Sequence, residues 1–231
     1  MPPHGPSPST AKKNPMSDEL LDVCDDNGCH VAEATRSEVH EQGLWHKTVH
    51  VWVFAPGLGD GHVLFQQRSA GKDIAPGMID VAVGGHLNKG ENPLAGAVRE
   101  LGEELGLHVP ASRLRFLGVR QSAHRFGQFV DREIQTVYGI VDNRGLEDYS
   151  VAAEEIAAIV HVPAGDGLEL FLGRVNRLVA PVFYSTNPGN APATGTRVLT
   201  NADFLPSVDG YFARVCLAAQ HVRRGDADVL L

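Results

Sequence analysis

The 231-residue sequence has few cysteines, few aromatic side chains and no long hydrophobic run. Its three cysteines, Cys24, Cys29 and Cys216, do not make a disulfide framework, and their odd number indicates a reducing compartment. No stretch reaches the roughly 18 apolar residues that a membrane span needs. The N-terminus also lacks the apolar core of a secretory signal. We therefore expect a cytoplasmic protein with no membrane partner.

An excess of positive charge is also absent, since 20 Lys and Arg stand against 28 Asp and Glu, a formal net charge of −8. A nucleic-acid polymer requires a basic surface, so we do not expect one as a partner. The acidity does not exclude a small anionic substrate, because bound metal ions would meet its charge locally. The hydrophobic content of 43% and the chain length predict a globular protein with a sizeable core.

A complete zinc site is also missing from the spacing of the cysteines and histidines. Cys24 and Cys29 have four residues between them, and His30 follows the second, which is half of such a site. A structural zinc site takes four ligands at short spacings, and the sequence has no second pair at the required spacing. We therefore do not expect bound zinc.

The first residues differ in composition from the rest of the chain. Residues 1–15 contain five prolines among small and polar residues, which predicts a disordered extension. Met16 is an alternative start for the folded chain. We predict one domain over residues 16–184, followed at 185–231 by a loop and a C-terminal helix that packs on the domain.

Apolar runs bounded by turn residues predict strands at 20–23, 30–32, 49–54, 62–67, 79–83, 114–119, 133–141 and 156–162. Turn residues at 25–28 make the first two a hairpin. Helices are predicted at 35–40, 93–105 and 168–178, and within 204–224, where Tyr211, Val215 and Ala218 share one side. Residues 68–78 and 185–197 are predicted loops. This order predicts an α/β (α+β) fold, a mixed sheet sandwiched between helices with a helical C-terminal extension.

Three glutamates in the predicted helix 93–105 form the most informative pattern. Glu100, Glu103 and Glu104 stand at i, i+3 and i+4, so their carboxylates share one face. Like charges so close repel unless a cation lies among them, and oxygen-only sites suit Mg²⁺ or Mn²⁺. The alternative is a solvated acidic face, which the three glutamates alone would favour. A second stripe on this helix predicts a buried face: Leu94, Ala97, Val98, Leu101 and Leu105.

The residues around these glutamates favour the metal site. Helix-end residues stand where they are expected, with Asn92 for the N-cap, Pro93 in the first turn and Gly106 for a left-handed C-cap. Arg99 precedes Glu103 by four residues and can hold its carboxylate. Gly85 is expected to open a turn, and Gly84 with Gly85 lets the backbone approach a metal or a phosphate.

The whole segment runs Gly85, five residues, Glu91, seven residues, and then Arg99-Glu100-Leu101-Gly102-Glu103-Glu104-Leu105-Gly106-Leu107. It resembles the signature of the Nudix hydrolases, with every fixed position filled. The resemblance implies the Nudix fold and Mg²⁺-dependent cleavage of a diphosphate within a larger organic molecule. It implies Glu100, Glu103, Glu104 and the carbonyl of Gly84 as metal ligands, Glu91 as a support and Arg99 as an orienting residue. On this family analogy we expect a nucleoside diphosphate or a diphosphate-linked nucleotide as substrate.

Segments outside this signature resemble isopentenyl diphosphate isomerase, a Nudix relative, from about residue 19 to 165. They are residues 44–52, 64–68, 76–80 and 84–86. His46 and His86 match two histidines of the isomerase metal site, and Asp131-Arg132-Glu133 resembles its acidic pair. The isomerase needs a cysteine where this chain has Gly84, whose side chain cannot transfer a proton. We expect the isomerase-like branch of the hydrolases, with an isomerase or a catalytically silent binding module as alternatives.

The general base is open among Glu133, Glu154, Glu155 and Glu103. Glu133 stands among apolar strand residues, where a carboxylate needs a reason. It is a candidate general base or an additional metal ligand, and an edge strand that faces water is the alternative explanation. Glu154 and Glu155 lie outside the signature, where many Nudix enzymes place the base.

Further candidates for substrate contacts carry positive charge or an imidazole. Arg68 and Lys72 precede Gly84 and are candidates for phosphate contacts or, equally, for solvated surface. His86 is a candidate substrate or metal contact, with a packed histidine as the alternative. A group of aromatic residues could line a nucleotide-base pocket or form core: Trp45, Trp52, Phe126, Phe129 and Tyr138. Either a monomer or a homodimer is compatible with the sequence.

Overall fold

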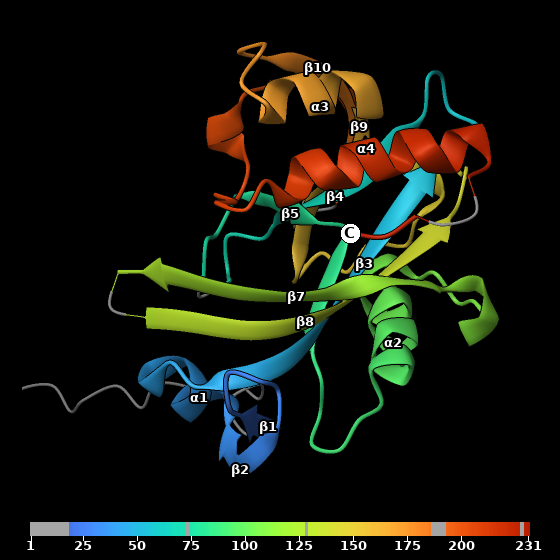
Figure 1. Cartoon of the computed structure of the whole chain (residues 1–231). Helices are drawn as coiled ribbons and strands as arrows, with labels where there is room; N and C mark the ends of the chain where they lie inside the picture. The colour runs from blue at the N-terminus through green and yellow to red at the C-terminus, as the bar shows by residue number, and fades with distance from the viewer. Residues whose placement is uncertain (1–18, 73, 128, 186–192, 227–228) are drawn as a thin grey trace, which may run out of the picture.

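The computed structural model describes residues 19–72, 74–127, 129–185, 193–226 and 229–231 (Figure 1). The extension predicted at residues 1–15 lies outside them. The described strands are β1 (Leu20–Cys24), β2 (His30–Thr35), β3 (Trp45–Ala55), β4 (His62–Arg68), β5 (Ile79–Val81), β6 (Val83–His86), β7 (Arg115–Phe126), β8 (Phe129–Val141), β9 (Ile156–Pro163), β10 (Leu178–Tyr184) and β11 (Ala193–Leu199). The described α-helices are α1 (Arg36–Gln42), α2 (Pro93–Leu105), α3 (Ala164–Phe171) and α4 (Tyr211–Arg224).

Strand β3 organises the mixed sheet. Along one edge it pairs in parallel with β8 over its whole length from Trp45 to Phe54. Along the other edge it pairs antiparallel with β1, then β6, then β4. Nearly all of its residues are buried, as expected for an apolar central strand with layers on both faces. The strands predicted at 49–54 and 62–67 are part of β3 and β4, which pair with each other.

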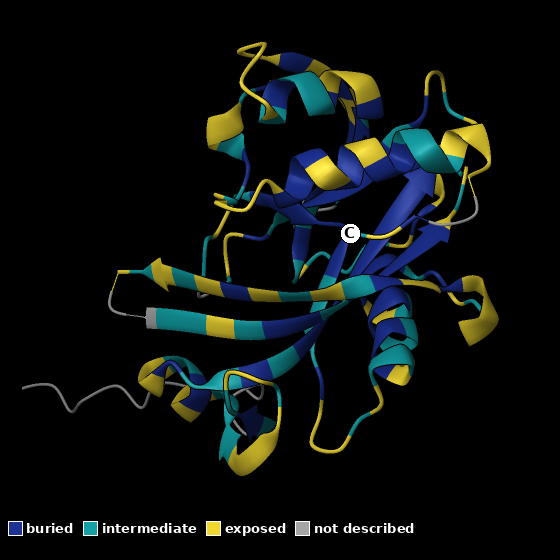
Figure 2. Ribbon diagram, viewed as in Figure 1, coloured by how far each residue is buried: buried dark blue, intermediate teal, exposed yellow. Residues whose placement is uncertain are grey.

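Two hydrophobic clusters cover the two faces of the sheet. Alternation along β3 sends Val49, Val51 and Val53 to the face packed by α2, and Trp52 and Phe54 to the opposite face, covered by α4. Figures 1 and 2 show α2 on one side of the sheet and α3 with α4 on the other. The predicted fold, a mixed sheet between helices with a C-terminal helix, is confirmed. Among the described residues, no helix has the length and apolar character that crossing a membrane requires.

The helix that carries the glutamates has the predicted ends. The Asn92 side chain accepts hydrogen bonds from the backbone of Leu94 and Ala95, Pro93 opens the first turn, and Gly106 ends the helix with φ +62°. Three residues of the predicted stripe, Ala97, Leu101 and Leu105, are fully buried, while Leu94 and Val98 pack at the margin of the same cluster. Local sequence therefore predicts this helix because its ends and its buried face are both encoded within it.

Two predictions near the C-terminus are wrong. The helix predicted at 168–178 is α3, which begins at Ala164 and ends at Phe171, and Leu178 already belongs to β10. The helix starts early because Gly167 lies against α4, where an added Cβ would stand 2.8 Å from Cys216 Sγ. The loop predicted at 185–197 is wrong for residues 193–197, which form β11 and pair with β10. Because β11 is an exposed edge strand, its polar sequence resembles that of a loop.

Candidate active site

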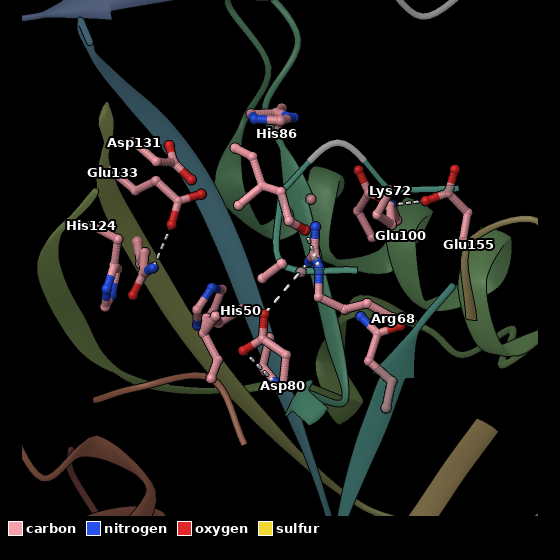
Figure 3. A pocket seen from close by; sticks show the side chains of 18 of the residues that line it. His50, Arg68, Lys72, Asp80, His86, Glu100, His124, Asp131, Glu133 and Glu155 are labelled. Carbon is pink, nitrogen blue, oxygen red and sulfur yellow. Dashed lines mark hydrogen bonds and ion pairs between the residues drawn. The ribbon is translucent and has the colours of Figure 1, made fainter. Parts of the chain in front are cut away.

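One pocket of about 1170 Å³ collects the predicted site residues. Its walls come from α1, α2, β3, β6, β7, β8, the loop after β4, and the segment before α4 with the start of that helix. The pocket-lining residues predicted from sequence are Arg68, Lys72, Gly84, His86, Arg99, Glu100, Glu103, Glu104, Glu133, Glu154 and Glu155. Glu91 does not line the pocket and instead contacts Arg99 from behind. In Figure 3, Asp131 and Glu133 lie across the pocket from Lys72 and Glu100, with His50 and Asp80 on a third side.

The three glutamates of α2 differ in exposure. Glu100 and Glu104 are buried, at 9% and 5% exposed, whereas the Glu103 side chain is largely exposed at 59%. Burial, reinforced by the charge of Glu100, raises the pKa of Glu104 to about 8, and burial also raises the pKa of Glu100. Two buried carboxylates on adjacent turns are unfavourable without a cation, and their oxygen donors suit a hard divalent ion. The residues present therefore fit Mg²⁺ or Mn²⁺.

Gly85 belongs to β6 rather than to a turn, so the expected turn at this position is wrong. Glycine at this position lets the Glu100 side chain lie across the backbone, and any larger residue would displace that side chain. A Cβ at Gly85 would stand 2.1 Å from Glu100 Cδ, far inside any contact distance. The close backbone approach that the sequence predicted here is thus an approach to a carboxylate.

Arg99 joins the acidic residues of the site. Its guanidinium donates to both carboxylate oxygens of Glu91 at 2.9 and 2.8 Å, to Glu100 at 2.8 Å and to Glu103 at 3.0 Å. It also donates to the carbonyl of His86 at 3.1 Å. The predicted contact with Glu103 is confirmed, and Arg99 fixes the helix against the end of β6 as well. Such a fork of charge-assisted hydrogen bonds sets the direction of the carboxylates.

A second cluster of metal-binding residue types lies in the same pocket. It contains His40 of α1, His46 of β3, His86 of β6, and Asp131 and Glu133 of β8. The three imidazole rings have centroids 5.1–5.4 Å apart, and His46 Nε2 lies 3.7 Å from Asp131 Oδ1. Among the described residues, His40 Nε2, His46 Nε2 and Asp131 Oδ1 are buried without a hydrogen-bond partner. Buried polar atoms of this kind indicate a missing ligand.

The protonation states of the histidines and carboxylates in the second cluster favour the binding of a cation. Burial lowers the pKa of His40 to about 4 and also lowers the pKa of His46 and of His86. At neutral pH the imidazoles are therefore neutral and can each offer a lone pair. Burial raises the pKa of Asp131 to about 6, against the charges of Arg68 and Arg36, and burial raises the pKa of Glu133 to about 7. A mixed nitrogen and oxygen donor set suits transition-metal ions such as Mn²⁺.

The two predicted phosphate contacts are already engaged by acidic groups. Arg68 lies 3.6 Å from Asp80 Oδ2 and donates to the carbonyl of Ile74 at 3.0 Å. Lys72 forms an ion pair with Glu155, and burial lowers the pKa of its ammonium group. Both cations therefore lie at the pocket wall, restrained by their partners, and an anionic ligand would compete with Asp80 or Glu155 for them.

The candidate bases have different environments. Glu133 accepts a hydrogen bond from Gln135 at 2.6 Å and has its pKa raised to about 7 by burial. Glu155 is ion-paired with Lys72, and Glu154 is exposed. Of these glutamates, Glu133 combines a position at the pocket with a pKa near neutrality, which suits a general base.

Several residues that form the pocket were not singled out by the sequence. His40 has no local signal, and only the fold brings it to His46 and His86. The segment before α4 and the first turn of that helix add a wall that contains Leu205, Pro206, Ser207, Tyr211 and Phe212. Of the predicted aromatic candidates, Phe126 lines the pocket, whereas Trp52 and Tyr138 belong to the core. The side chain of Phe129 lies outside the described part of the structure.

Comparison with known proteins agrees with this architecture. A family model described as the NUDIX domain matches residues 44–168. A Nudix hydrolase of Clostridium acetobutylicum that is named as uncharacterised is 30% identical over 203 residues, which cover 88% of this chain and 98% of that protein. Nudix hydrolase 3 of Arabidopsis thaliana is 34% identical over 153 residues, which cover 64% of this chain but 20% of that longer protein. The chain belongs to the Nudix hydrolase family.

A solved structure supports the fold. The crystal structure of DR0079 from Deinococcus radiodurans superposes with a TM-score of 0.50 and covers 67% of this chain and 90% of that protein. Its sequence identity to this chain is 20%, so this likeness concerns the fold alone. Nudix hydrolases in general are pyrophosphohydrolases that need a divalent cation, usually Mg²⁺. That requirement fits the buried carboxylates of α2.

Proposed function

We propose that this protein is a Mg²⁺-dependent hydrolase that cleaves the diphosphate bond of a nucleoside diphosphate or of a small molecule linked to one. The observation that carries the proposal is the burial of Glu100 and Glu104 beside Gly84 and Gly85, with Arg99 joining Glu91, Glu100 and Glu103. The family supports diphosphate hydrolysis in general, and the nucleotide part of the proposal is by family analogy.

Glu100, Glu104 and the carbonyl of Gly84 would hold the cation, with Glu103 at the exposed margin of the same face. The ion, when bound, would supply Lewis-acid neutralisation of the diphosphate oxygens. Arg99 keeps the carboxylates oriented, and Arg68 and Lys72 offer positive charge to a terminal phosphate. Glu91 supports Arg99 without reaching the substrate.

The proton of the attacking water would pass to a carboxylate at the pocket wall. We propose Glu133 for this role, because Gln135 fixes its side chain and its pKa of about 7 permits proton uptake near neutral pH. Glu103 is the alternative acceptor, since it lies on the glutamate face of α2 and is exposed to the pocket. Each glutamate is replaced by Gln in turn, and kcat is measured against pH. The substitution that removes the true base should abolish the acidic limb of the profile, and the other substitution should leave that limb in place.

The histidine cluster also bears on the isomerase alternative, because the resemblance places His46 and His86 in an isomerase-type metal site. The position that would require a cysteine is Gly84, which has no side chain to move a proton. We therefore propose the isomerase-like branch of the hydrolases for this chain, with the reaction of a hydrolase. A second cation site near the diphosphate would then be formed by His40, His46, His86 and Asp131.

A panel of compounds with Mg²⁺ tests the proposal: nucleoside diphosphates, sugar nucleotides, dinucleotides and isopentenyl diphosphate. Release of phosphate or mononucleotide supports hydrolysis, isomer without phosphate supports the isomerase, and no change in any compound supports a binding module. Glu104→Gln should lower turnover by about 100-fold or more, in the range for one catalytic group. Glu169→Gln is the matched control, because Glu169 is half-exposed on α3, pairs with Arg174 and does not line the pocket. Equal turnover of the two variants would refute the assignment.

A further inference from the structure

Two hydrogen bonds between buried side chains connect β3 to the first residue of α4. The indole Nε1 of Trp52 donates to the Tyr211 hydroxyl at 2.8 Å, and this hydroxyl lies 3.2 Å from Nδ1 of His50. His50 and Trp52 are two residues apart and therefore point to the same face of β3. All three side chains are buried, at 8% exposed or less.

Counting donors and acceptors favours one tautomer of the His50 imidazole. An indole N–H can only donate, so the Tyr211 oxygen accepts from Trp52 and has one proton of its own to donate. Among the described residues, Nδ1 of His50 is the group within hydrogen-bond distance that can accept this proton, and accepting it makes Nδ1 the unprotonated nitrogen. In a doubly protonated imidazole, Nδ1 would also be a donor. The Tyr211 hydroxyl proton would then have no acceptor in this group of three side chains. His50 is therefore a neutral imidazole that carries its proton on Nε2.

The protonated nitrogen faces the candidate site. His50 lines the pocket and pairs across the sheet with Gly84 of β6. A Cβ at Gly84 would lie 3.7 Å from His50 Nε2, so this nitrogen stands directly beside the backbone that leads to the buried glutamates. Among the residues that the structure describes, none forms a hydrogen bond with Nε2. The pocket thus contains an oriented N–H donor that has no acceptor among the described residues.

We propose that His50 contacts the substrate, donating its Nε2–H to an oxygen of the diphosphate beside Gly84, and that Tyr211 is a positioning residue that fixes this tautomer. This inference rests on the proposed function. We assign a phosphate oxygen as the acceptor of the His50 Nε2–H, because Nε2 lies beside Gly84, whose carbonyl is one of the proposed cation ligands. A neutral donor stabilises that oxygen without adding a charge that would compete with a cation.

The arrangement gives the C-terminal segment a part in the active site. Arg120 lies over the Tyr211 ring at 4.3 Å and donates to Asp209 at 2.7 and 3.1 Å. The same arginine donates to Gln135 at 2.6 Å, and Gln135 in turn donates to Glu133. Residues 209–211 therefore hold the groups on two sides of the pocket, and the role that we give to Tyr211 is to position His50.

Two substitutions of His50 separate a substrate contact from a structural role. The amide nitrogen of Gln reaches the place of Nε2, whereas Asn reaches only the place of Nδ1, where its oxygen can still accept from Tyr211. We expect His50→Asn to lose about 10- to 100-fold in kcat/KM, the range for a hydrogen bond to a charged group, and His50→Gln to stay within about 5-fold of wild type. A structural role predicts the opposite order, and His50→Asn equal to or better than His50→Gln would overturn the proposal.

The tautomer is tested without any substrate. Long-range ¹H–¹⁵N spectra of the histidine side chains distinguish the two neutral forms, and the His50 signals are assigned by their loss in His50→Gln. We expect the Nε2–H form in the wild type and a mixture of forms in Tyr211→Phe, which keeps the buried ring. An Nδ1–H or doubly protonated His50 at neutral pH would overturn the proposal. If Glu104→Gln loses turnover while His50→Asn does not, the proposed function stands and this inference fails.

Discussion

Removal of the charge at Glu104 should stabilise the metal-free protein at alkaline pH. The unfolded chain ionises this carboxyl near pH 4.5, whereas burial raises its pKa to about 8 in the fold. Between these values the folded protein keeps a proton that the unfolded chain has lost. The free energy of unfolding therefore falls as the pH rises through this window, and the stability contributed by the protonated form is lost above about pH 8.

The size of this effect follows from the two pKa values. At about 1.36 kcal/mol per pKa unit, the difference between 4.5 and about 8 corresponds to about 5 kcal/mol. Glu104→Gln keeps the shape and can still accept from Gln66, but it has no proton to lose. At roughly 2–4 °C per kcal/mol for a chain of this size, we expect the variant to melt about 10 °C or more above the wild type at pH 9.

The assay is thermal unfolding by circular dichroism in EDTA, over a series from about pH 5 to pH 9. The two melting temperatures should agree near pH 5, where Glu104 is protonated, and separate progressively above neutrality. Saturating Mg²⁺ should then raise the wild type more than the variant, because the ion binds the folded site and is held by the ionised carboxylate. If Glu104→Gln melts at or below the wild type at pH 9 in EDTA, the buried carboxylate is not a source of strain.

Three further predictions concern the contacts around the two clusters. Gly85→Ala places a Cβ against Glu100, so the Mg²⁺ affinity measured by isothermal titration calorimetry should fall about tenfold or more. The control is Gly165→Ala, whose Cβ meets nothing within 4 Å and which should leave the Mg²⁺ affinity unchanged. Arg99→Lys replaces a fork with a single ammonium group, so kcat should fall about 10- to 100-fold, and an unaltered kcat would show that the fork is dispensable. His46→Asn should weaken Mn²⁺ binding, followed by electron paramagnetic resonance, by about tenfold or more, and it should leave Mg²⁺ affinity unchanged. An equal loss of affinity for both ions would mean that the two clusters form a single site.

The part of the fold that the sequence predicts best is encoded locally. The helix at 93–105 has its cap, its first-turn proline, its terminal glycine and its buried stripe within fifteen residues, and the structure reproduces all of them. The expected turn at Gly85 is wrong for a related reason. A glycine indicates that something comes close or that φ is positive, but local sequence does not show which, and here the close neighbour is Glu100, fifteen residues further along the chain.

The errors near the C-terminus also arise from contacts between distant residues. Ala164 to Gly167 has the composition of a turn, yet it forms the start of α3 because the absence of a side chain at Gly167 lets α4 approach. In β11 only Leu199 is buried, so alternation of apolar and polar residues, the usual signal of a strand, is missing. These residues form a strand because β10 offers them hydrogen bonds.

The histidine cluster could be predicted only in part. His46 and His86 were linked by resemblance, but His40 joins them through the packing of α1 against β8 and has no sequence signal of its own. The in-register parallel pairing of β3 with β8 places Glu133 beside His46, although 87 residues separate them in the sequence. Pairing register is a tertiary property, because neither strand alone specifies which residue lies opposite which.

One face of β3 contains both the end of the core and the beginning of the pocket. Trp52 and Phe54 are packed by the residues of α4, whereas His50 and His46, on the same face of the strand, line or adjoin the pocket. The change occurs where α4 begins, at Tyr211, whose hydroxyl bonds to residues on both sides of the boundary. The position of this helix therefore decides how much of the strand is exposed to a ligand. A relative with a different segment before α4 should differ in the substrate it accepts more than in the cation it binds, because the glutamates of α2 lie on another wall.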